Sequence, residues 1–202
     1  MATAPVASAP DTRERLVGAA REVIESGGYA AASVAAIAER AGVATGTLYR
    51  HFPSKAELFV EIVRSASRRE LEALREASAS AAGSFAERLD AVVETYARRA
   101  LRKRRLAWAL VYEPADPLVD AERLAYRREY TRQMAGFLRA GIAAGEIPDQ
   151  DVELTAAAIV GVISEVLVGP LSPFADRSAA EEEVVAAIVR FCRDGVVAAG
   201  SR

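Results

Sequence analysis

The sequence predicts an all-α protein of about nine helices, and two observations lead to this prediction. No window shows convincing period-two alternation of apolar and polar residues, the pattern of a half-buried strand. The chain is also rich in alanine, arginine and glutamate, whose side chains lose little rotamer freedom in a helix. With 202 residues, it is long enough for one large domain or two modest domains with their own cores.

Helix starts recur along the chain as capping pairs. A Ser or Asp followed three residues later by Glu can satisfy the free backbone amides of a first turn. Each such pair here precedes apolar residues at helical spacing, and the pairs are Asp11/Glu14, Ser54/Glu57, Ser84/Glu87 and Ser178/Glu181. Asp116 before Pro117 indicates a further start, because proline fits the first position of a helix.

The N-terminal third of the chain is expected to form four helices in succession. Apolar residues from Leu16 to Ile24 give the first helix one face, and Gly27-Gly28 is expected to close it. A short second helix spans Val34 to Ala41, a third runs roughly from Ala44 to Phe52, and the fourth begins at Ser54.

Five further helices are expected in the rest of the chain. The fifth follows Ser84, a break at "EPADP" separates a short sixth from a long seventh, and the seventh ends near Gly145. One apolar run, Leu154 to Leu171, is long enough to span a bilayer. Because Ser164 and Glu165 interrupt this run and no basic flank follows it, we interpret it as a buried helix and expect no membrane association.

The stretch "AGVATGTLYRHFPSKAEL", residues 41–58, has the spacing of a helix-turn-helix. Ala38 is small where two helices cross, Gly42 can take positive φ in the turn, and Leu48 anchors the second helix. Ser33 can cap the first helix of the pair.

The outer face of the third helix gathers donors suited to phosphate oxygens and base edges. Its residues are Thr45, Gly46, Thr47, Tyr49, Arg50 and His51, with Lys55 just beyond. Gly46 has no side chain to hold the helix away from a groove wall. Charge alone would not have found this site, since the chain carries a net charge of −2. Tyr49 packing across the helix pair is the plainer alternative for that residue.

This stretch resembles the DNA-binding signature of the TetR family of transcriptional regulators. The resemblance is carried by "SVAAIAERAGVATGTLYRHFPSKAELF", particularly "GVATGTLYRHF" followed by "SK" and an acidic residue. It implies a homodimer that places two recognition helices in successive major grooves of a palindromic double-stranded DNA operator.

The resemblance also implies roles for individual residues. Thr45 and Thr47 would lie at the groove, and Gly46 would permit close approach. Arg50 would read a base or contact another phosphate. The phosphate contacts would come from Ser33, Tyr49, His51 and Lys55. Ala44 departs from the family pattern, in which a hydroxyl residue is common, and it has no hydroxyl with which to contact a phosphate.

We therefore expect three segments along the chain. Residues 1–10, rich in Ala, Pro and Ser, are expected to be a disordered lead-in. Residues 11–55 would form the helix-turn-helix DNA-binding domain, and residues 56–202 a larger helical domain for ligand binding and dimerisation.

In the family, the second domain encloses a ligand cavity, and the aromatic residues concentrated here are candidates to line it. Plain core packing is an equally good explanation for them. The candidates for contact with an unknown small-molecule effector are Trp108, Tyr112, Tyr130, Phe137 and Glu165. The basic run Arg98 to Arg105 is interpreted as a solvated helix end, and contact with a phosphate-bearing ligand is the less favoured alternative.

The last two helices are expected to form the dimer interface. Ala157, Gly161 and Ser164 or Glu165 recur at helical spacing and would let two backbones approach closely, while the final helix adds an aliphatic face with Cys192. Packing within one chain is the alternative.

The sequence thus predicts a ligand-responsive DNA-binding regulator, expected to be a repressor. An enzyme is not expected, because the chain has one His and one Cys, no zinc-ligand spacing and no nucleotide-binding glycine pattern. No cofactor is implied. A single cysteine fits the reducing cytoplasm. A helical protein–protein interaction module without DNA binding is the alternative function.

Overall fold

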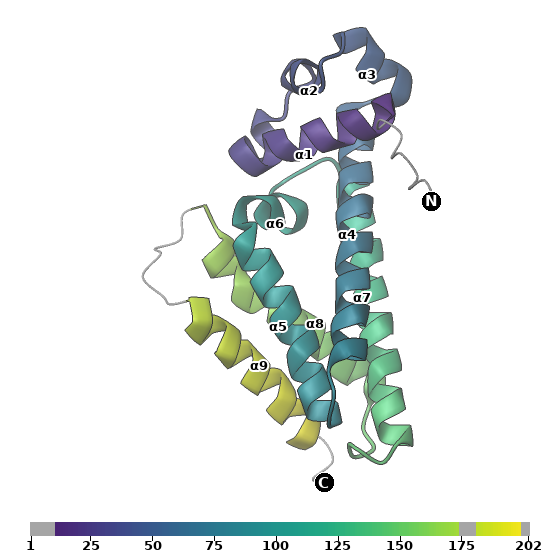
Figure 1. Cartoon of the computed structure of the whole chain (residues 1–202), viewed down its shortest axis with the longest axis vertical. Coiled ribbons are helices and arrows are strands. Elements are labelled where there is room, and N and C mark those ends of the chain that lie inside the picture. The colour runs from purple at the N-terminus through teal and green to yellow at the C-terminus, as the bar shows by residue number, and fades with distance from the viewer. Residues whose placement is uncertain (1–10, 174–180, 199–202) are drawn as a thin grey trace, which may run out of the picture.

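The computed structural model describes residues 11–173 and 181–198 (Figure 1). Within these ranges the protein has nine helices and no strand, so the all-α prediction is confirmed. The helices are α1 Thr12–Ala31, α2 Val34–Ala41, α3 Thr45–His51, α4 Lys55–Ser80, α5 Phe85–Arg102, α6 Arg104–Val111, α7 Pro117–Ala143, α8 Val152–Leu171 and α9 Glu181–Ala198. The expected lead-in and the cap at Ser178 lie outside the described residues.

The predicted caps determine where several helices begin. The Asp11 side chain accepts from the amides of Arg13 and Glu14, and the Ser54 hydroxyl accepts from the Glu57 amide. At Ser84 both halves of a capping box are present, and Asp116 caps a helix whose first residue is Pro117.

The end of α1 differs from the prediction at Gly27-Gly28. Gly28 has φ +80°, which breaks the helical path there, but the helix resumes and continues to Ala31. The Glu113 carboxylate, from the segment between α6 and α7, accepts from the Tyr29 amide at 2.9 Å. This carboxylate provides acceptors for amides that the kink leaves without helical partners.

Helix α4 joins two hydrophobic cores. Figure 1 shows α1, α2 and α3 at one end of the molecule, with α4 running from them to the opposite end. Leu58, Phe59 and Ile62 of α4 belong to the N-terminal core, which also takes in Leu106 of α6 and Val119 of α7. The second core lies among α5, α7, α8 and α9. Helices α4, α6 and α7 therefore connect the two ends of the molecule.

Helix α8 is buried on one face only, which corrects the expectation of a buried helix. Ile159, Ile163 and Leu167 pack inward, but Leu154 is 67% exposed and Val166 is 43% exposed. Only 28% of the helix's most apolar window is buried, and by length and composition α8 is the one described helix that could cross a membrane. Its position against α5, α6, α7 and α9 makes it part of the helical domain.

The basic run at the end of α5 is not simply solvated, in contrast to the interpretation from sequence. Arg98 pairs with Glu182 of α9, Arg99 with Glu70 of α4, and Lys103 with Glu25 of α1. Arg104, the first residue of α6, pairs with Glu181 of α9. Four cations of the run therefore form ion pairs with other helices. The C-terminal end of α5 is thus a meeting point of α1, α4 and α9.

Candidate DNA-binding surface and ligand cavity

The third helix forms as the helix-turn-helix pattern predicts. Gly42 ends α2 with φ +65°, and the turn leads into α3, whose first residue is Thr45. Leu48 and Phe52 are buried and hold the helix against the N-terminal core. Ala44, at the N-cap of α3, makes no side-chain capping hydrogen bond, since alanine has no side-chain acceptor.

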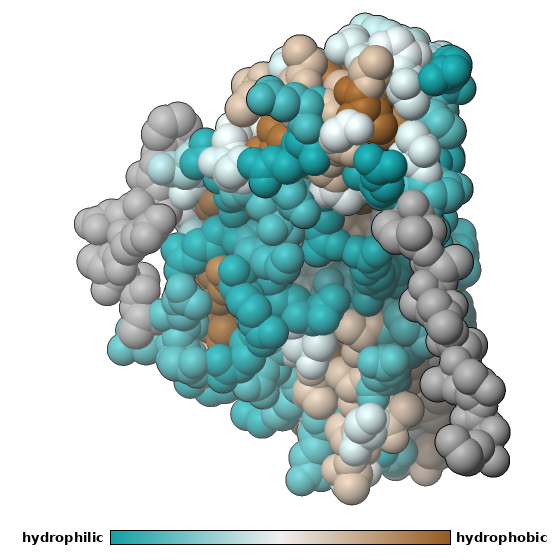
Figure 2. Space-filling model, turned by 45° about the horizontal axis from the view of Figure 1, so that its top comes forward, coloured by the Kyte–Doolittle hydropathy of each residue, from teal (hydrophilic) through white to brown (hydrophobic). Residues whose placement is uncertain are grey.

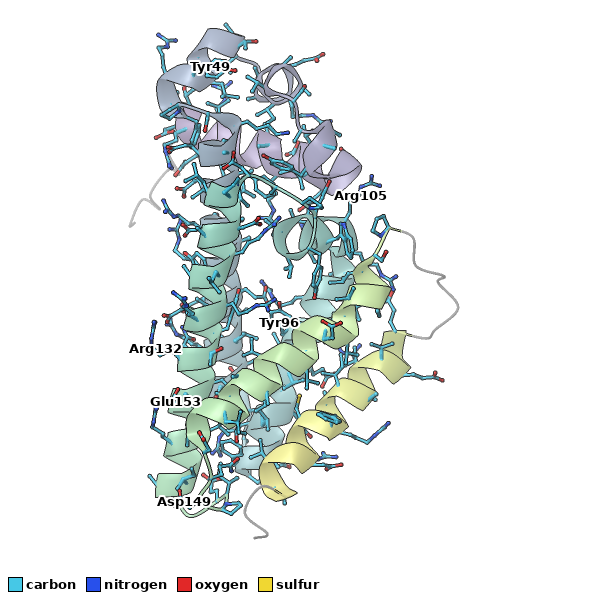
Figure 3. All side chains as sticks on the ribbon, turned by 180° about the vertical axis from the view of Figure 1, so that it is seen from behind. Tyr49, Tyr96, Arg105, Arg132, Asp149 and Glu153 are labelled. Carbon is cyan, nitrogen blue, oxygen red and sulfur yellow. The ribbon has the colours of Figure 1, made fainter. Side chains whose placement is uncertain are left out.

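The opposite face of α3 is open to solvent. Its exposed residues are Thr45, Gly46, Tyr49, Arg50 and His51, with Thr47 half-buried among them. Tyr49 is 52% exposed, which argues against packing across the helix pair as its role. Figure 3 shows Tyr49 at the end of the molecule farthest from Asp149. Arg50 donates to the Thr47 hydroxyl at 3.0 Å, so the two side chains are held together on this face.

Packing among the described residues gives no reason for glycine at position 46. A Cβ added there would meet no atom within 4 Å, and its φ is not in the positive range. Glycine inside a helix destabilises it by about 1 kcal/mol relative to alanine. The absence of a side chain is therefore better explained by a binding partner that approaches this face of α3 closely.

Ser33 and Lys55 are placed differently from the exposed face of α3. Ser33 is exposed, and its hydroxyl accepts from the Ala36 amide at 3.1 Å, which leaves its own proton free to donate. The Lys55 ammonium instead donates to the Tyr29 carbonyl at 2.9 Å and lies 4.0 Å from the centre of the Tyr29 ring. Burial lowers the pKa of Lys55. The structure thus brings Lys55 to the junction of α1 and α4 rather than into the α3 group.

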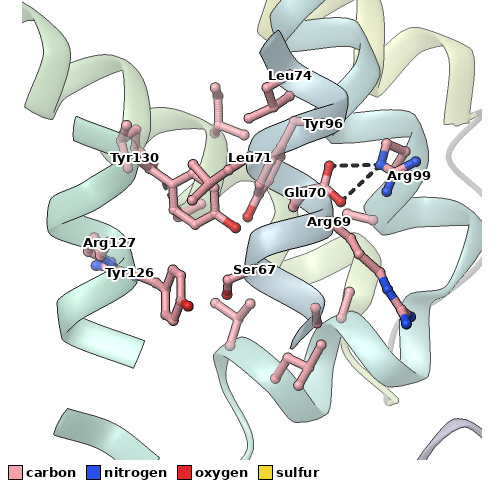
Figure 4. Close-up of a pocket in the computed structure, with 18 of the residues that line it drawn as sticks. Ser67, Arg69, Glu70, Leu71, Leu74, Tyr96, Arg99, Tyr126, Arg127 and Tyr130 are labelled. Carbon is pink, nitrogen blue, oxygen red and sulfur yellow. Dashed lines mark hydrogen bonds and ion pairs between the residues drawn. The ribbon is translucent and has the colours of Figure 1, made fainter. Parts of the chain in front are cut away.

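A cavity of about 960 Å³ lies in the helical domain, with walls from α4, α5, α6, α7 and α8 (Figure 4). Of the residues that the sequence suggested for it, Tyr130 and Phe137 line the cavity, and Trp108, Tyr112 and Glu165 do not. The Tyr112 hydroxyl donates to the Ser164 carbonyl, and the ring centres of Trp108 and Tyr112 lie 5.3 Å apart. Glu165 is exposed on α8.

Most of the lining residues were missed from sequence, and α4 contributes more of them than any other helix. Ser67, Leu71 and Leu74 follow the spacing of one helical face, and Glu70 lies beside them. The apolar wall includes Leu71, Leu74, Val92, Met134, Phe137 and Ile163. The wall also holds polar groups, among them an ion pair in which Arg99 Nε lies 3.0 and 2.9 Å from the two Glu70 oxygens. Burial raises the pKa of Glu70, and the Arg99 guanidinium opposes that rise.

The cavity meets solvent at a cationic rim that includes Arg69, Arg102 and Arg127. All three residues line the cavity and are exposed, and none has a salt-bridge partner in the described part of the chain. Figure 4 shows the Arg69 guanidinium extending outward from the wall. Hydrophilic residues predominate over the middle of the face in Figure 2. An apolar interior with unpaired guanidinium groups at its mouth suits an amphipathic anion.

Two family models match this chain. The model described as "Bacterial regulatory proteins, tetR family" matches residues 16–62, and "Tetracyclin repressor-like, C-terminal domain" matches residues 82–168. The HTH-type transcriptional repressor KstR of Mycobacterium tuberculosis is 31% identical over 175 residues, which are 86% of this chain and 76% of that protein. The chain belongs to the TetR family. It is a ligand-responsive DNA-binding transcriptional regulator, and the relatives that it matches are regulators.

Other members of the TetR family match this chain over different shares of its length. KstR of Mycolicibacterium smegmatis is 40% identical, but over 83 residues that make up 40% of its length. The fatty acid metabolism regulator protein of Bacillus subtilis is 28% identical over 154 residues, 75% of this chain and 79% of that protein. The structure of FadR from Bacillus subtilis in complex with stearoyl-CoA has a TM-score of 0.75 at 24% identity, covering 90% of this chain and 98% of that one.

Proposed function

We propose that this TetR-family protein is a cytoplasmic repressor that binds a palindromic operator as a homodimer and releases it on binding a long-chain acyl-CoA. The observation that carries the choice of effector is the cavity. Its interior is mainly apolar, whereas its rim holds the guanidinium groups of Arg69, Arg102 and Arg127, which have no ion pair among the described residues.

The two parts of an acyl-CoA match the two parts of this site. An acyl chain would replace water against Leu71, Val92 and Phe137, where apolar contact is favourable. The phosphate groups of coenzyme A would remain at the rim, where guanidinium forms strong charge-assisted hydrogen bonds. Similarity to a regulator of fatty acid metabolism, and a fold shared with a regulator that binds stearoyl-CoA, support this class of effector.

DNA binding is assigned to the exposed face of α3. Thr45, Gly46 and Thr47 lie at its N-terminal end, the part of a recognition helix that reaches base edges. Tyr49 and His51 are exposed donors for phosphate, and Ser33 supplies another from α2's N-terminus. A dimer would place two such helices about 34 Å apart, one turn of DNA.

The proposed dimer interface is formed by α8 and α9. Leu154, Val166, Phe191 and Val197 are large apolar side chains exposed on these two helices. Ala157 and Gly161 are also exposed on α8. Exposed apolar residues on neighbouring helices indicate a surface that another protein covers, and a second copy would do so symmetrically.

Operator binding can be tested by selection from random duplexes. We expect a palindromic motif whose affinity falls steeply as salt rises, because phosphate contacts release counterions. Failure of a folded protein to enrich any motif would contradict the assignment of α3.

The effector is tested on the selected operator with stearoyl-CoA, free stearate and coenzyme A. Stearoyl-CoA should release the DNA at much lower concentration than the other two. Arg69→Gln and Arg102→Gln should each weaken stearoyl-CoA binding by about tenfold, since each removes a charge-assisted hydrogen bond. Arg105→Gln is the matched control, because Arg105 is exposed but does not line the cavity. Equal release by free stearate would contradict the role of the rim.

A further inference from the structure

The mainly apolar cavity contains a group of phenol side chains. Tyr96 of α5 and Tyr130 of α7 meet edge to face, with ring centres 6.1 Å apart and an interplanar angle of 82°. Tyr126 and Ser67 line the same part of the wall. Figure 4 shows the hydroxyls of Tyr96 and Tyr130 directed toward the space between α4 and α7.

The Tyr96 hydroxyl has no hydrogen-bond partner among residues 11–173 and 181–198, and it lines the cavity. Tyr112 provides the contrast within the same domain, since its hydroxyl lies outside the cavity and donates to the Ser164 carbonyl. Tyr130 is near the Ser67 hydroxyl, which can hydrogen-bond to it. Burial raises the pKa of both Tyr96 and Tyr130, so each phenol keeps its proton and remains a donor at neutral pH.

The neighbouring carboxylate does not satisfy Tyr96. Both Glu70 oxygens are within 3.0 Å of Arg99 Nε, and no bond joins Glu70 to Tyr96 in the part of the chain that the structure describes. Before an effector binds, water can hydrate the Tyr96 phenol. An unsubstituted alkyl chain would displace that water and leave a buried donor without an acceptor, which is costly.

We propose that the effector carries an oxygen acceptor, a hydroxyl or a ketone, on its apolar part, held by the phenols of Tyr96 and Tyr130. This inference rests on the effector site proposed above and specifies which acyl groups that site favours. The selectivity comes from the buried donors, because a site built to hydrogen-bond an oxygen discriminates against an analogue that lacks it.

The test compares stearoyl-CoA with its 3-hydroxy, 10-hydroxy, 12-hydroxy and 12-oxo derivatives by calorimetry and by operator release. At least one oxygenated derivative should bind about fivefold more tightly than stearoyl-CoA, the size of effect that one neutral hydrogen bond produces. Tyr96→Phe and Tyr130→Phe should reduce that preference to less than about twofold.

The preference is a ratio measured on one protein, so a general loss of stability in a variant cancels. Tyr112→Phe is the matched control and should keep the preference, because its phenol lies outside the cavity. The proposal is overturned if no oxygenated derivative binds more tightly than stearoyl-CoA, or if Tyr96→Phe retains the full preference.

The experiment can separate failure of the acyl-CoA proposal from failure of the inference about the phenols. If no acyl-CoA binds, the same series is measured as free acids and methyl esters. A preference for oxygenated members that Tyr96→Phe abolishes would support the inference about the phenols while refuting coenzyme A as the head group. No preference in that series would overturn the inference as well.

Discussion

Gly46 is exposed on α3, and no atom of the described residues lies within 4 Å of the position that a Cβ would take there. Gly46→Ala should leave stability unchanged or raise it by up to about 1 kcal/mol, because alanine favours the helix. It should also weaken operator binding by about tenfold or more, because the added methyl would hold α3 away from the groove. Thermal unfolding and a DNA titration measure the two effects.

Gly136→Ala provides the control for this substitution. Gly136 is an exposed glycine within α7, and an added Cβ there also meets no atom within 4 Å. Its substitution should stabilise the protein similarly and leave DNA affinity unchanged. Equal DNA affinity of Gly46→Ala and wild type would contradict the proposed close approach.

Arg50 and Lys55 are both cations near α3, but we expect their substitutions to act differently. Lys55→Ala removes the bond to the Tyr29 carbonyl and the contact with its ring, so it should destabilise the protein by about 1–2 kcal/mol. Arg50→Ala removes only an exposed bond to Thr47, so the melting temperature should hardly change, whereas operator affinity and its salt dependence should fall. A destabilised Arg50→Ala, or a Lys55→Ala as stable as wild type, would reverse these assignments.

At the scale of elements, α6 connects the cavity to the DNA-binding domain. Leu106 and Leu110 of α6 line the cavity, and Leu106 also belongs to the N-terminal core. Just after α6, Glu113 accepts from the amides of Tyr29 and Ala30 at the end of α1. Movement of α6 on ligand binding would therefore act directly on α1.

Glu113→Ala should reduce the coupling between effector and operator. The effector should still bind, because Glu113 does not line the cavity, but its presence should lower operator affinity less than in wild type. The measurement is the ratio of operator dissociation constants with and without saturating stearoyl-CoA. A ratio equal to that of wild type would show that the link does not carry the coupling.

The ion pair between Glu146 and Arg88, at the start of α5, should make the stability of the protein depend on pH. Glu146, in the turn between α7 and α8, pairs with Arg88 and accepts from the Phe85 amide at 2.7 Å. The hydrogen bond with Arg88 holds the pKa of Glu146 below its usual value of 4.5. The ionised Glu146 carboxylate therefore contributes fully to the stability of the fold above about pH 4.5. This stabilisation is lost as the pH falls through the lower pKa that Glu146 has in the folded state.

Glu146→Gln should lower the melting temperature at pH 6 and flatten its decrease between pH 5 and 3. Glu183→Gln is the matched control, since Glu183 is exposed on α9 and has no ion pair within the described ranges. A variant whose melting temperature falls with acid as steeply as that of wild type would contradict the role of Glu146.

At the scale of the whole molecule, dimerisation should depend on the outer faces of α8 and α9. Phe191 is 62% exposed in the single chain, and Phe191→Asp should convert the dimer to monomers because a charge would be buried in the interface. Operator affinity should then fall by at least about a hundredfold with the loss of simultaneous binding to two half-sites. Sedimentation and DNA titration give the two results.

Leu118→Asp tests whether any exposed apolar residue has this effect. Leu118 is 55% exposed near the start of α7, away from α8 and α9. The variant should remain dimeric and bind operator normally. Dissociation by Leu118→Asp, but not by Phe191→Asp, would place the interface elsewhere.

The sequence predicted features that depend on neighbouring residues better than features that depend on packing. Gly42, Ser84 and Asp116 act through bonds to amides or carbonyls a few residues away, so their roles could be predicted from short patterns. The α3 face was predicted in the same way, apart from Lys55, whose partner Tyr29 is 26 residues distant in the chain.

The cavity could be predicted only in part, because its walls depend on how long helices turn against one another. Aromatic residues at helical spacing identified Tyr130 and Phe137, but gave the same signal for Trp108 and Tyr112, whose faces point elsewhere. Glu70 of α4 was not among the candidates, because its place in the wall depends on the packing of α4 against α5, which brings Arg99 beside it.

Trp108, which does not line the cavity, is the only tryptophan in the sequence, and this makes the protein its own optical probe. It lies on α6, the helix between effector and DNA-binding domain, with its ring against Tyr112. Its fluorescence therefore comes from one known position. A change in emission when ligand fills the cavity would report movement of α6, without any dye and without direct quenching by the ligand. Stopped-flow recordings of that emission could time this movement against release of labelled operator.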